Sequence, residues 1–265
     1  KKEHYKLIKT KGIVQERSID FTNITFLPRM QEIAEGYGWM DLNNMIDNCN
    51  ISWVEEFYAN VLGRPDDDFT SYWRERAHTE DEYTEMPRTL ALPGRDWHYT
   101  SREARSRLQI TDMMPVAKGW AKWLVRNFES CSNETEIIMS RCHTIYAIMR
   151  GEPIQIGEMI ARSIKRMITG LNSYIGHPFI NTTLCQRLHV PIEDDTDEIA
   201  IPMDPIDRVF FRRAVRDLEA AQAATATPQP PPPAPHHQQH QQHQVPPHIP
   251  QQHQYSDYEL GMAAT

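Results

Sequence analysis

The chain has 265 residues, 24% of them charged, and its formal net charge at pH 7 is -8. This acidic balance argues against a general nucleic-acid-binding protein, because such proteins gain affinity by neutralising phosphates with Lys and Arg. No apolar run approaches the roughly 20 residues that span a bilayer, so we expect neither a transmembrane segment nor a membrane partner.

The N-terminal residues and the cysteines bear on the compartment. Residues 1–9 are basic but lack the apolar core of a secretion signal. The four cysteines, at positions 49, 131, 142 and 185, are too scattered for a disulfide framework, which predicts reduced thiols. We therefore expect an intracellular protein, in the nucleus or the cytoplasm.

The C-terminal end has a different composition from the rest. Residues 223–265 hold nine Pro, nine Gln and six of the twelve His, whereas residues 1–222 carry all six Trp and all four Cys. The tail cannot bury enough apolar surface to offset its chain entropy. We predict a disordered tail over 223–265, with local polyproline II at Pro230–Pro233, after a body large enough for a core.

The first 100 residues predict three helices separated by loops. A weak alternation over 13–26 indicates a short extended segment. Pro28 opens a helix that ends at Glu35 before a glycine. A second helix covers 52–61, with Ser52 as N-cap and Glu55 three residues later. Prolines and glycines punctuate 62–100, which predicts loops around a short helix near 69–77.

The remaining elements are also predicted to be helical. Asp112 caps a helix with Pro115 in its first turn, and Asn133 with Glu136 forms a capping-box pattern that opens a helix over 134–150. Further helices are expected over 156–169 and 178–189, an acidic loop over 193–198, and a last helix that starts at Asp204-Pro205 and ends near Ala221. The fold class is therefore mainly α, with at most short extended segments.

Several stretches in a fixed order are not generic. They are Arg17–Phe21, Gly38-Trp39, Trp53–Val61, Ile110–Asp112 with Trp120 and Trp123, Ser132–Thr135, Ile145–Gly151, Ile154–Ile160, Leu184-Cys185 and Pro205–Asp207. In this order they resemble the putative plant transposon protein domain, which occurs in plant proteins derived from retroelements. The resemblance covers roughly residues 10 to 215 and implies one folded domain over 1–215. It carries no catalytic residue over to this chain.

One departure from the family pattern follows Val61. In relatives, an extended segment with an Arg-Gly pair comes after the Glu-Phe-Tyr-Ala-Asn element, whereas here Val61 continues directly into Leu62-Gly63-Arg64-Pro65. A piece on the order of one hairpin is missing. We therefore expect Phe57 and Tyr58 to be partly uncovered, and the isolated chain to be marginally stable or to aggregate.

The sequence offers little support for a metal site or a catalytic nucleophile. Cys142-His143 is the only close Cys/His pair of the predicted body, there is no Cys-x-x-Cys, and Cys142 lies on the apolar stripe Ile138–Met149, so a core thiol is favoured over a ligand. Asp66–Asp68 could bind a cation, but a solvated turn is favoured. No Gly-x-Ser-x-Gly elbow or phosphate-binding Gly loop occurs.

Clusters of basic residues are the strongest sequence evidence for nucleic-acid binding. Arginines and a lysine gather in three places, namely Arg102, Arg105 and Arg107; Arg162, Lys165 and Arg166; and Arg208, Arg212 and Arg216. Each fits the solvated face of an amphipathic helix or loop better than a phosphate site. Trp120 and Trp123 could stack on bases, but their spacing favours a place in the core.

These observations predict a non-catalytic, element-derived structural or protein-interaction protein. We expect no catalytic, cofactor-binding or metal-ligating residue and no cofactor, with self-association or protein partners through helical faces. The alternative is a nucleic-acid-associated accessory protein or a degenerate relative of transposases. A relic without a selected function is a third interpretation.

The position of Cys142 gives a first testable prediction. Cys142→Ser should lower the free energy of unfolding by roughly 1–3 kcal/mol, because a hydroxyl would be buried on an apolar stripe. Denaturant unfolding measures this loss, and metal analysis of the purified protein should show the same zinc content before and after the change. Stoichiometric zinc that disappears in the variant would contradict a core role for this thiol.

Overall fold

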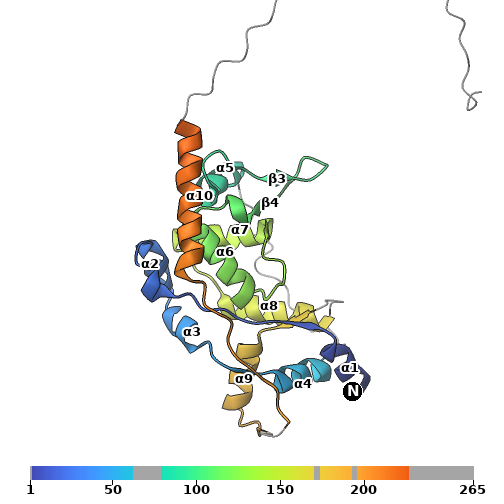
Figure 1. Ribbon diagram of the computed structural model, residues 1–265. Helices are drawn as coiled ribbons and strands as arrows, with labels where there is room; N and C mark the ends of the chain where they lie inside the picture. The colour runs from blue at the N-terminus through green and yellow to red at the C-terminus, as the bar shows by residue number, and fades with distance from the viewer. Residues whose placement is uncertain (1, 62–78, 170–173, 193–195, 227–265) are drawn as a thin grey trace, which may run out of the picture. The chain divides into compact units, whose positions relative to one another are not determined.

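The computed structural model describes residues 2–61, 79–169, 174–192 and 196–226, which form one compact unit (Figure 1). The described part is mainly helical with few short strands, as the sequence predicted. The helices are α1 Lys2–Lys9, α2 Pro28–Gly36, α3 Met40–Met45, α4 Ile51–Val61, α5 Glu80–Leu90, α6 Pro115–Asn127, α7 Met139–Arg150, α8 Ile156–Thr169, α9 Pro178–Arg187 and α10 Arg208–Ala226.

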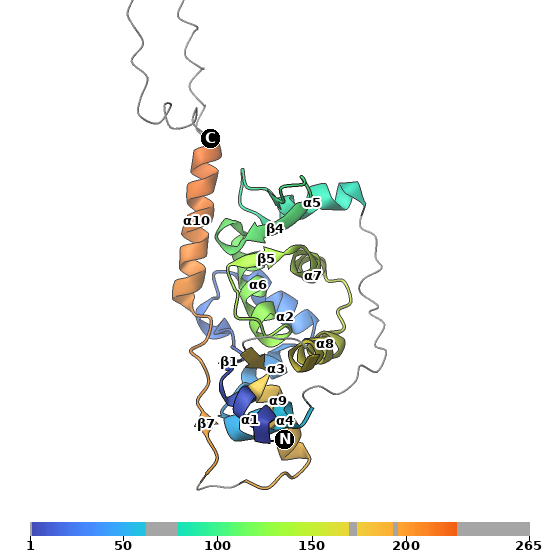
Figure 2. The same ribbon diagram turned by 90° about the vertical axis from the view of Figure 1, so that its right-hand side faces the viewer.

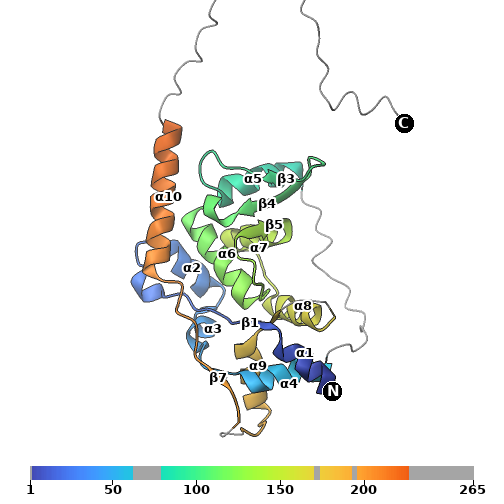
Figure 3. The same cartoon turned by 45° about the vertical axis from the view of Figure 1, so that its right-hand side comes forward.

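The strands form three small sheets. The seven described strands are β1 Gly12–Val14, β2 Cys49–Asn50, β3 His98–Tyr99, β4 Arg105–Gln109, β5 Glu136–Ile138, β6 Tyr174–Gly176 and β7 Ile199–Ala200. The pair β1–β6 is parallel, β2–β7 is antiparallel, and β3–β4–β5 is an antiparallel sheet that lies beside α5 and α7 (Figure 3). The strands therefore tie together helices that are far apart in the sequence.

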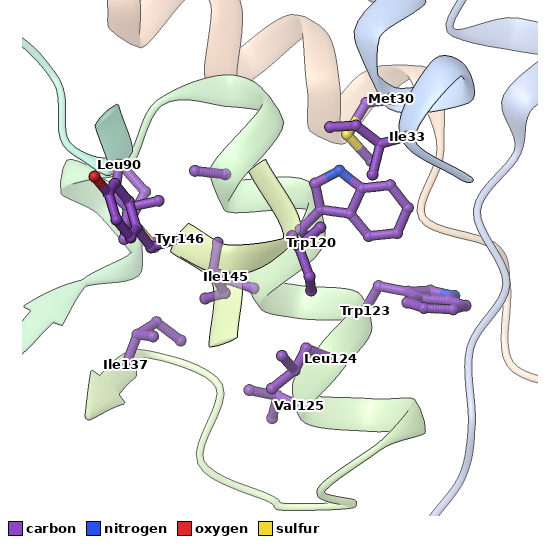
Figure 4. Close-up of a cluster of buried hydrophobic side chains, with 14 of the residues drawn as sticks. Met30, Ile33, Leu90, Trp120, Trp123, Leu124, Val125, Ile137, Ile145 and Tyr146 are labelled. Carbon is purple, nitrogen blue, oxygen red and sulfur yellow. The ribbon is translucent and has the colours of Figure 1, made fainter. Parts of the chain in front are cut away.

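The main core is built around α6. Trp120 and Trp123 of α6 are almost fully buried (Figure 4). Phe128 is buried as well, and Trp39 packs against all three rings. The sequence placed both tryptophans in the core, and the structure confirms this. Gly119 lets α10 approach α6, because a Cβ there would lie 2.5 Å from Cε1 of Phe211.

A second apolar cluster joins α1, α4, α8 and the β1–β6 pair. Ile8, Val54, Met167 and Ile175 are buried in it, and Tyr58 at its centre has no exposed surface. The expectation that a gap after Val61 leaves Tyr58 uncovered is therefore wrong, because α1 and Met167 cover it. Residues 62–78, which include Asp66–Asp68 and the expected helix over 69–77, lie outside the described residues.

Helix α5 was missed in the sequence because Pro87 stands inside it. Thr79 and Glu82 form a capping box at its start. A proline at 87 cannot donate to the carbonyl of Tyr83, four residues earlier. The indole N–H of Trp97 donates to that carbonyl instead, at 3.0 Å. A long-range side chain thus replaces the lost helical hydrogen bond.

The helix expected over 134–150 begins later, at Met139. Residues 136–138 form β5, which pairs with β4 through Arg107↔Ile138 and Gln109↔Glu136. The side-chain oxygen of Asn133 accepts from the amide of Thr135 at 3.1 Å, which makes a local turn in place of a helix cap. The predicted stop at Gly151 is confirmed by its left-handed φ of 71°.

Three predicted helix starts are also corrected. Asn50, not Ser52, accepts from the first turn of α4, at 3.0 Å from the amide of Trp53. Helix α6 starts after Met114, and Asp112 instead belongs to the short 3-10 turn η3 Ile110–Asp112. Helix α10 is capped by Asp207, whose carboxylate accepts from the amide of Phe210 at 3.0 Å. Asp204-Pro205 lie before the helix, and Ile206, which follows them, bridges to Ile19.

Helix α10 continues to Ala226, beyond the predicted end near Ala221, so residues 223–226 are helical. The rest of the predicted tail, residues 227–265, lies outside the described residues.

Residues 14–20 run through the interior as an extended segment, which we call the central strap. Asn127 accepts from the amide of Arg17 at 3.1 Å and donates to its carbonyl at 2.9 Å. Asn43 does the same for Ile19, at 2.7 and 2.9 Å. The strap therefore satisfies its backbone groups through buried side chains of α3 and α6.

Candidate functional site

A polar centre lies where the loop after α6 meets the turn between β6 and α9, close to β1 and α8. Figure 2 shows where β1, α8 and α9 lie. Ser130 and His177 are fully buried there, and both are non-glycine residues with positive φ, 42° and 56°. Left-handed backbone at such residues costs about 1–3 kcal/mol and is often found at functional sites. The strain at these two residues makes the polar centre a candidate functional site.

The two strained residues hold each other. The Ser130 hydroxyl donates to the carbonyl of Val14 at 3.1 Å and accepts from the amide of His177 at 3.2 Å. Gly176 lies so close that a Cβ there would be 1.9 Å from the Ser130 Oγ. Ser163 of α8 donates to the carbonyl of Glu129 at 2.6 Å. The contacts of these serines are therefore all with backbone, which is a structural use of the hydroxyls.

His177 is the most unusual group of this centre. Neither ring nitrogen has a hydrogen-bond partner among the described residues. Burial lowers the pKa of His177 to about 3, and the charge of Arg166 adds to this shift. The imidazole is therefore neutral at physiological pH, and it is closed off from solvent.

Glu16 of the central strap lies at the N-terminus of α9. Its carboxylate accepts from the amides of Phe179 and Ile180 at 3.0 and 3.2 Å. Burial raises the pKa of Glu16 to about 7, although both amides favour the charged form. The carboxylate thus fills the position that an external anion would take at this helix end.

Two weak acids complete the surroundings. Tyr58 donates to the carbonyl of Gly176 at 3.0 Å, and burial raises the pKa of its hydroxyl. Burial, with the nearby charges of Glu16 and Asp47, raises the pKa of Cys49 to about 12. Neither group is poised to lose its proton near neutral pH.

Cys131 differs from the other three cysteines, because its environment lowers the pKa of the thiol whereas theirs raise it. Burial works to raise its pKa, but hydrogen bonds from Tyr174 and Arg141, together with the charge of Arg141, hold the pKa below its ordinary value. The guanidinium of Arg141 is fixed by Glu129, with Nε 2.7 Å from the carboxylate. Cys131 is half-buried. Sequence reasoning missed this environment because Glu129, Arg141 and Tyr174 are brought together only by the fold.

The candidates weighed in the sequence do not join this centre. Cys142 is fully buried, its thiol donates to the carbonyl of Ile137 at 3.2 Å, and burial raises its pKa to about 12. His143 packs against the ring of Tyr83. Nowhere in the described ranges do three or more His, Cys, Asp or Glu side chains gather in a way that could hold a metal ion.

Members of all three basic clusters contact groups of the fold. Arg105 pairs with Glu80, and Arg107 pairs with Glu136 at 3.0 Å. Arg162 and Arg166 lie 2.6 and 3.9 Å from the carboxylates of Glu158 and Glu129. On α10, Arg212 stands over the ring of Phe26 at 5.5 Å. These contacts use part of the positive charge that a phosphate backbone would need.

Two grooves flank the C-terminal half of α10. One, of about 550 Å³, lies against α5 and is lined by aromatic groups that include Tyr83, Trp97 and Tyr99. The other, of about 770 Å³, is lined by Lys118, Phe210 and Asp217. Lys118 and Asp217 form an ion pair at 3.0 Å across this groove, and Arg95 pairs with Asp112 at 3.5 Å.

Exposed apolar side chains are concentrated in the segment that runs from α9 to just beyond β7. Of the thirteen large hydrophobic side chains that are exposed among the described residues, seven fall within positions 184–203. They are Leu184, Leu188, Val190, Ile192, Ile199, Ile201 and Met203, which we call the apolar strip. The alternation Ile199, Ile201, Met203 is visible in the sequence, but a period of two does not tell which face is turned to solvent.

A family model described as the putative plant retrotransposon-related domain matches residues 35–191. This is more than half of the chain, so the protein belongs to this family of plant retrotransposon-related domains. No curated protein and no solved structure matches the chain. Among the described helices, none is both long and apolar enough to cross a membrane.

The polar centre predicts an unusual dependence of stability on pH. Glu16 has a pKa of about 7 in the fold against an ordinary value of 4.5, so the fold retains a proton and its contribution falls as pH rises from about 4.5 to 7. His177 has a pKa of about 3 against an ordinary 6.5, so its contribution rises as pH rises from about 3 to 6.5. The two slopes oppose each other between about pH 4.5 and 6.5.

Glu16→Gln should remove the falling slope and leave the rising one. We expect the unfolding free energy of the variant, relative to the wild type, to rise by up to about 3 kcal/mol from pH 4.5 to 7. Urea unfolding at several pH values measures this difference, with Glu35→Gln on the surface of α2 as control. Parallel pH profiles for Glu16→Gln and the wild type would show that Glu16 ionises normally.

Proposed function

We propose that this plant retrotransposon-related protein is non-catalytic and acts through contacts with other protein chains. The observation that carries the proposal is the apolar strip, which leaves seven large hydrophobic side chains in water within twenty positions. Large exposed apolar patches mark interaction sites, whereas apolar side chains exposed singly are ordinary on protein surfaces.

The state of the polar groups supports the non-catalytic part. A general base must reach a substrate proton, but His177 is fully buried and Glu16 is held by two amides of α9. The buried hydroxyls of Ser130 and Ser163 donate to backbone carbonyls. These groups hold loops in place, and the strain at Ser130 and His177 is balanced by the hydrogen bond between them.

The second candidate, a nucleic-acid-associated accessory protein, has weaker support. It rests on Arg208, Arg212 and Arg216, which are exposed along α10. Against it stand the net charge of -8 and the ion pairs of Arg105, Arg107 and Arg162. A surface of this kind is expected to bind phosphates only non-specifically.

Fluorescence anisotropy with labelled nucleic acid separates the two candidates. With a short single-stranded RNA and a short DNA duplex, we expect dissociation constants weaker than about 1 µM at physiological salt. The double change Arg208→Gln and Arg216→Gln should leave the signal unchanged. Nanomolar affinity that weakens steeply with salt and is lost in this variant would favour the nucleic-acid candidate instead.

A further inference from the structure

Strand β7 is hydrogen-bonded to the rest of the fold along the edge that faces β2. It pairs with β2 through Cys49↔Ala200 and Asn50↔Ile199, and the amide of Ile51 donates to the carbonyl of Glu198 at 2.7 Å. In an antiparallel ladder, alternate residues direct their backbone groups to the partner strand. Glu198 and Ala200 therefore face β2, whereas the N–H and C=O groups of Ile199 point to the outer edge. The same alternation, continued one step past the end of β7, gives the backbone groups of Ile201 the outer direction as well.

In the segment 199–203 the side chains face the opposite way from those of a usual surface strand, with large apolar residues turned to solvent. Ile199, Ile201 and Met203 are 52%, 78% and 36% exposed, while Ala200 packs beside Cys49 and Phe179. Surface strands normally turn polar side chains to water. Here the small residue faces the core and the large apolar residues face solvent.

The segment is also held in an extended form beyond β7. Arg17 of the central strap donates from its guanidinium to the carbonyls of Asp204 and Pro205. The amide of Ile206 donates to the carbonyl of Ser18 at 2.8 Å. Pro202 is two residues after Ala200, so the same alternation turns its backbone toward the β2 side. Proline has no N–H to donate, but this loss does not affect the N–H groups on the outer edge.

We propose that this outer edge, Ile199–Met203, pairs antiparallel with the same segment of a second copy of the chain, around a two-fold axis beside Ile201. An antiparallel pair of identical strands is self-complementary by symmetry. The segment Ile-Ala-Ile-Pro-Met holds no charge, so no like charges meet on the axis. Ile201 would lie opposite its own mate, and Ile199 opposite Met203.

The exposure of the apolar strip favours a second copy as the partner. Its seven side chains are between 36% and 78% exposed, so the strip supplies apolar surface that an interface of standard size, roughly 800 Å² on each partner, would cover. Because the strand is already extended and anchored by Arg17, little ordering is needed on binding. This inference deepens the proposed function, since it names the partner of the same surface.

The oligomeric state in solution tests the pairing with the full chain. Light scattering after size exclusion should give twice the mass of one chain, with dissociation on dilution. Ile201→Lys should weaken the dimer by at least about tenfold, because two lysines would face each other at the interface centre. Val209→Lys, at another exposed position, should leave the dimer unchanged. A wild-type monomer over the whole concentration range, or a dimer untouched by Ile201→Lys, would overturn the pairing.

If Ile201→Lys fails to fold, a disulfide cross-link between two copies tests the same pairing. In a hydrogen-bonded antiparallel pair the facing Cα atoms lie about 5.5 Å apart, which suits a disulfide. Ile201→Cys in a Cys185→Ser background should form a covalent dimer under mild oxidation, whereas Val209→Cys should not. Equal cross-linking of both would overturn the pairing. A folded monomer that binds no nucleic acid would refute the second copy and leave the proposed function intact.

Discussion

The buried hydrogen bonds of the central strap are the constraint on which the rest of the structure depends. An extended segment in a protein interior must satisfy every backbone N–H and C=O group, and each one left unpaired costs about 1–3 kcal/mol. Asn127 and Asn43 each give one donor and one acceptor to a single strap residue, as a neighbouring β-strand would. Two asparagines from helices thus replace part of a sheet.

The strap connects the polar centre with the outer edge of β7. Its Val14 carbonyl accepts from Ser130, and its Glu16 carboxylate holds the start of α9. Further along the strap, Arg17 and Ser18 fix the segment that follows β7. Buried polar groups in this protein therefore position elements, and the surface that they position is apolar. This relation supports the interaction role that we propose.

The parts of the fold that sequence reasoning found are those that local signals decide. Helix α8 was expected over the residues it occupies, and α2 was expected within one residue, because periodicity and glycine stops are written in the sequence. Long-range partners decided the rest. The indole of Trp97 donates the hydrogen bond that Pro87 of α5 cannot donate. Residues 136–138 pair with β4 and form a strand where a helix was predicted, and α1 packs over Tyr58.

The candidate site was less predictable than the fold. Expected core residues such as Cys142 and the two tryptophans were identified by their spacing on apolar faces. The pairing of Ser130 with His177 across 47 positions, and of Glu16 with Phe179 across 163, leaves no local pattern. The inversion of Ile199 and Ile201 depends on which side β2 occupies, and this information is tertiary.

Native-state hydrogen exchange of the Arg17 and Ile19 amides tests the role of the central strap most directly. Both amides donate to asparagine side chains, so they are protected only if α3, α6 and the strap stay together. We predict that both exchange with the free energy of global unfolding, as do amides in the middle of α6. Exchange as fast as in exposed turns, while α6 remains protected, would show that the strap opens by itself and organises nothing.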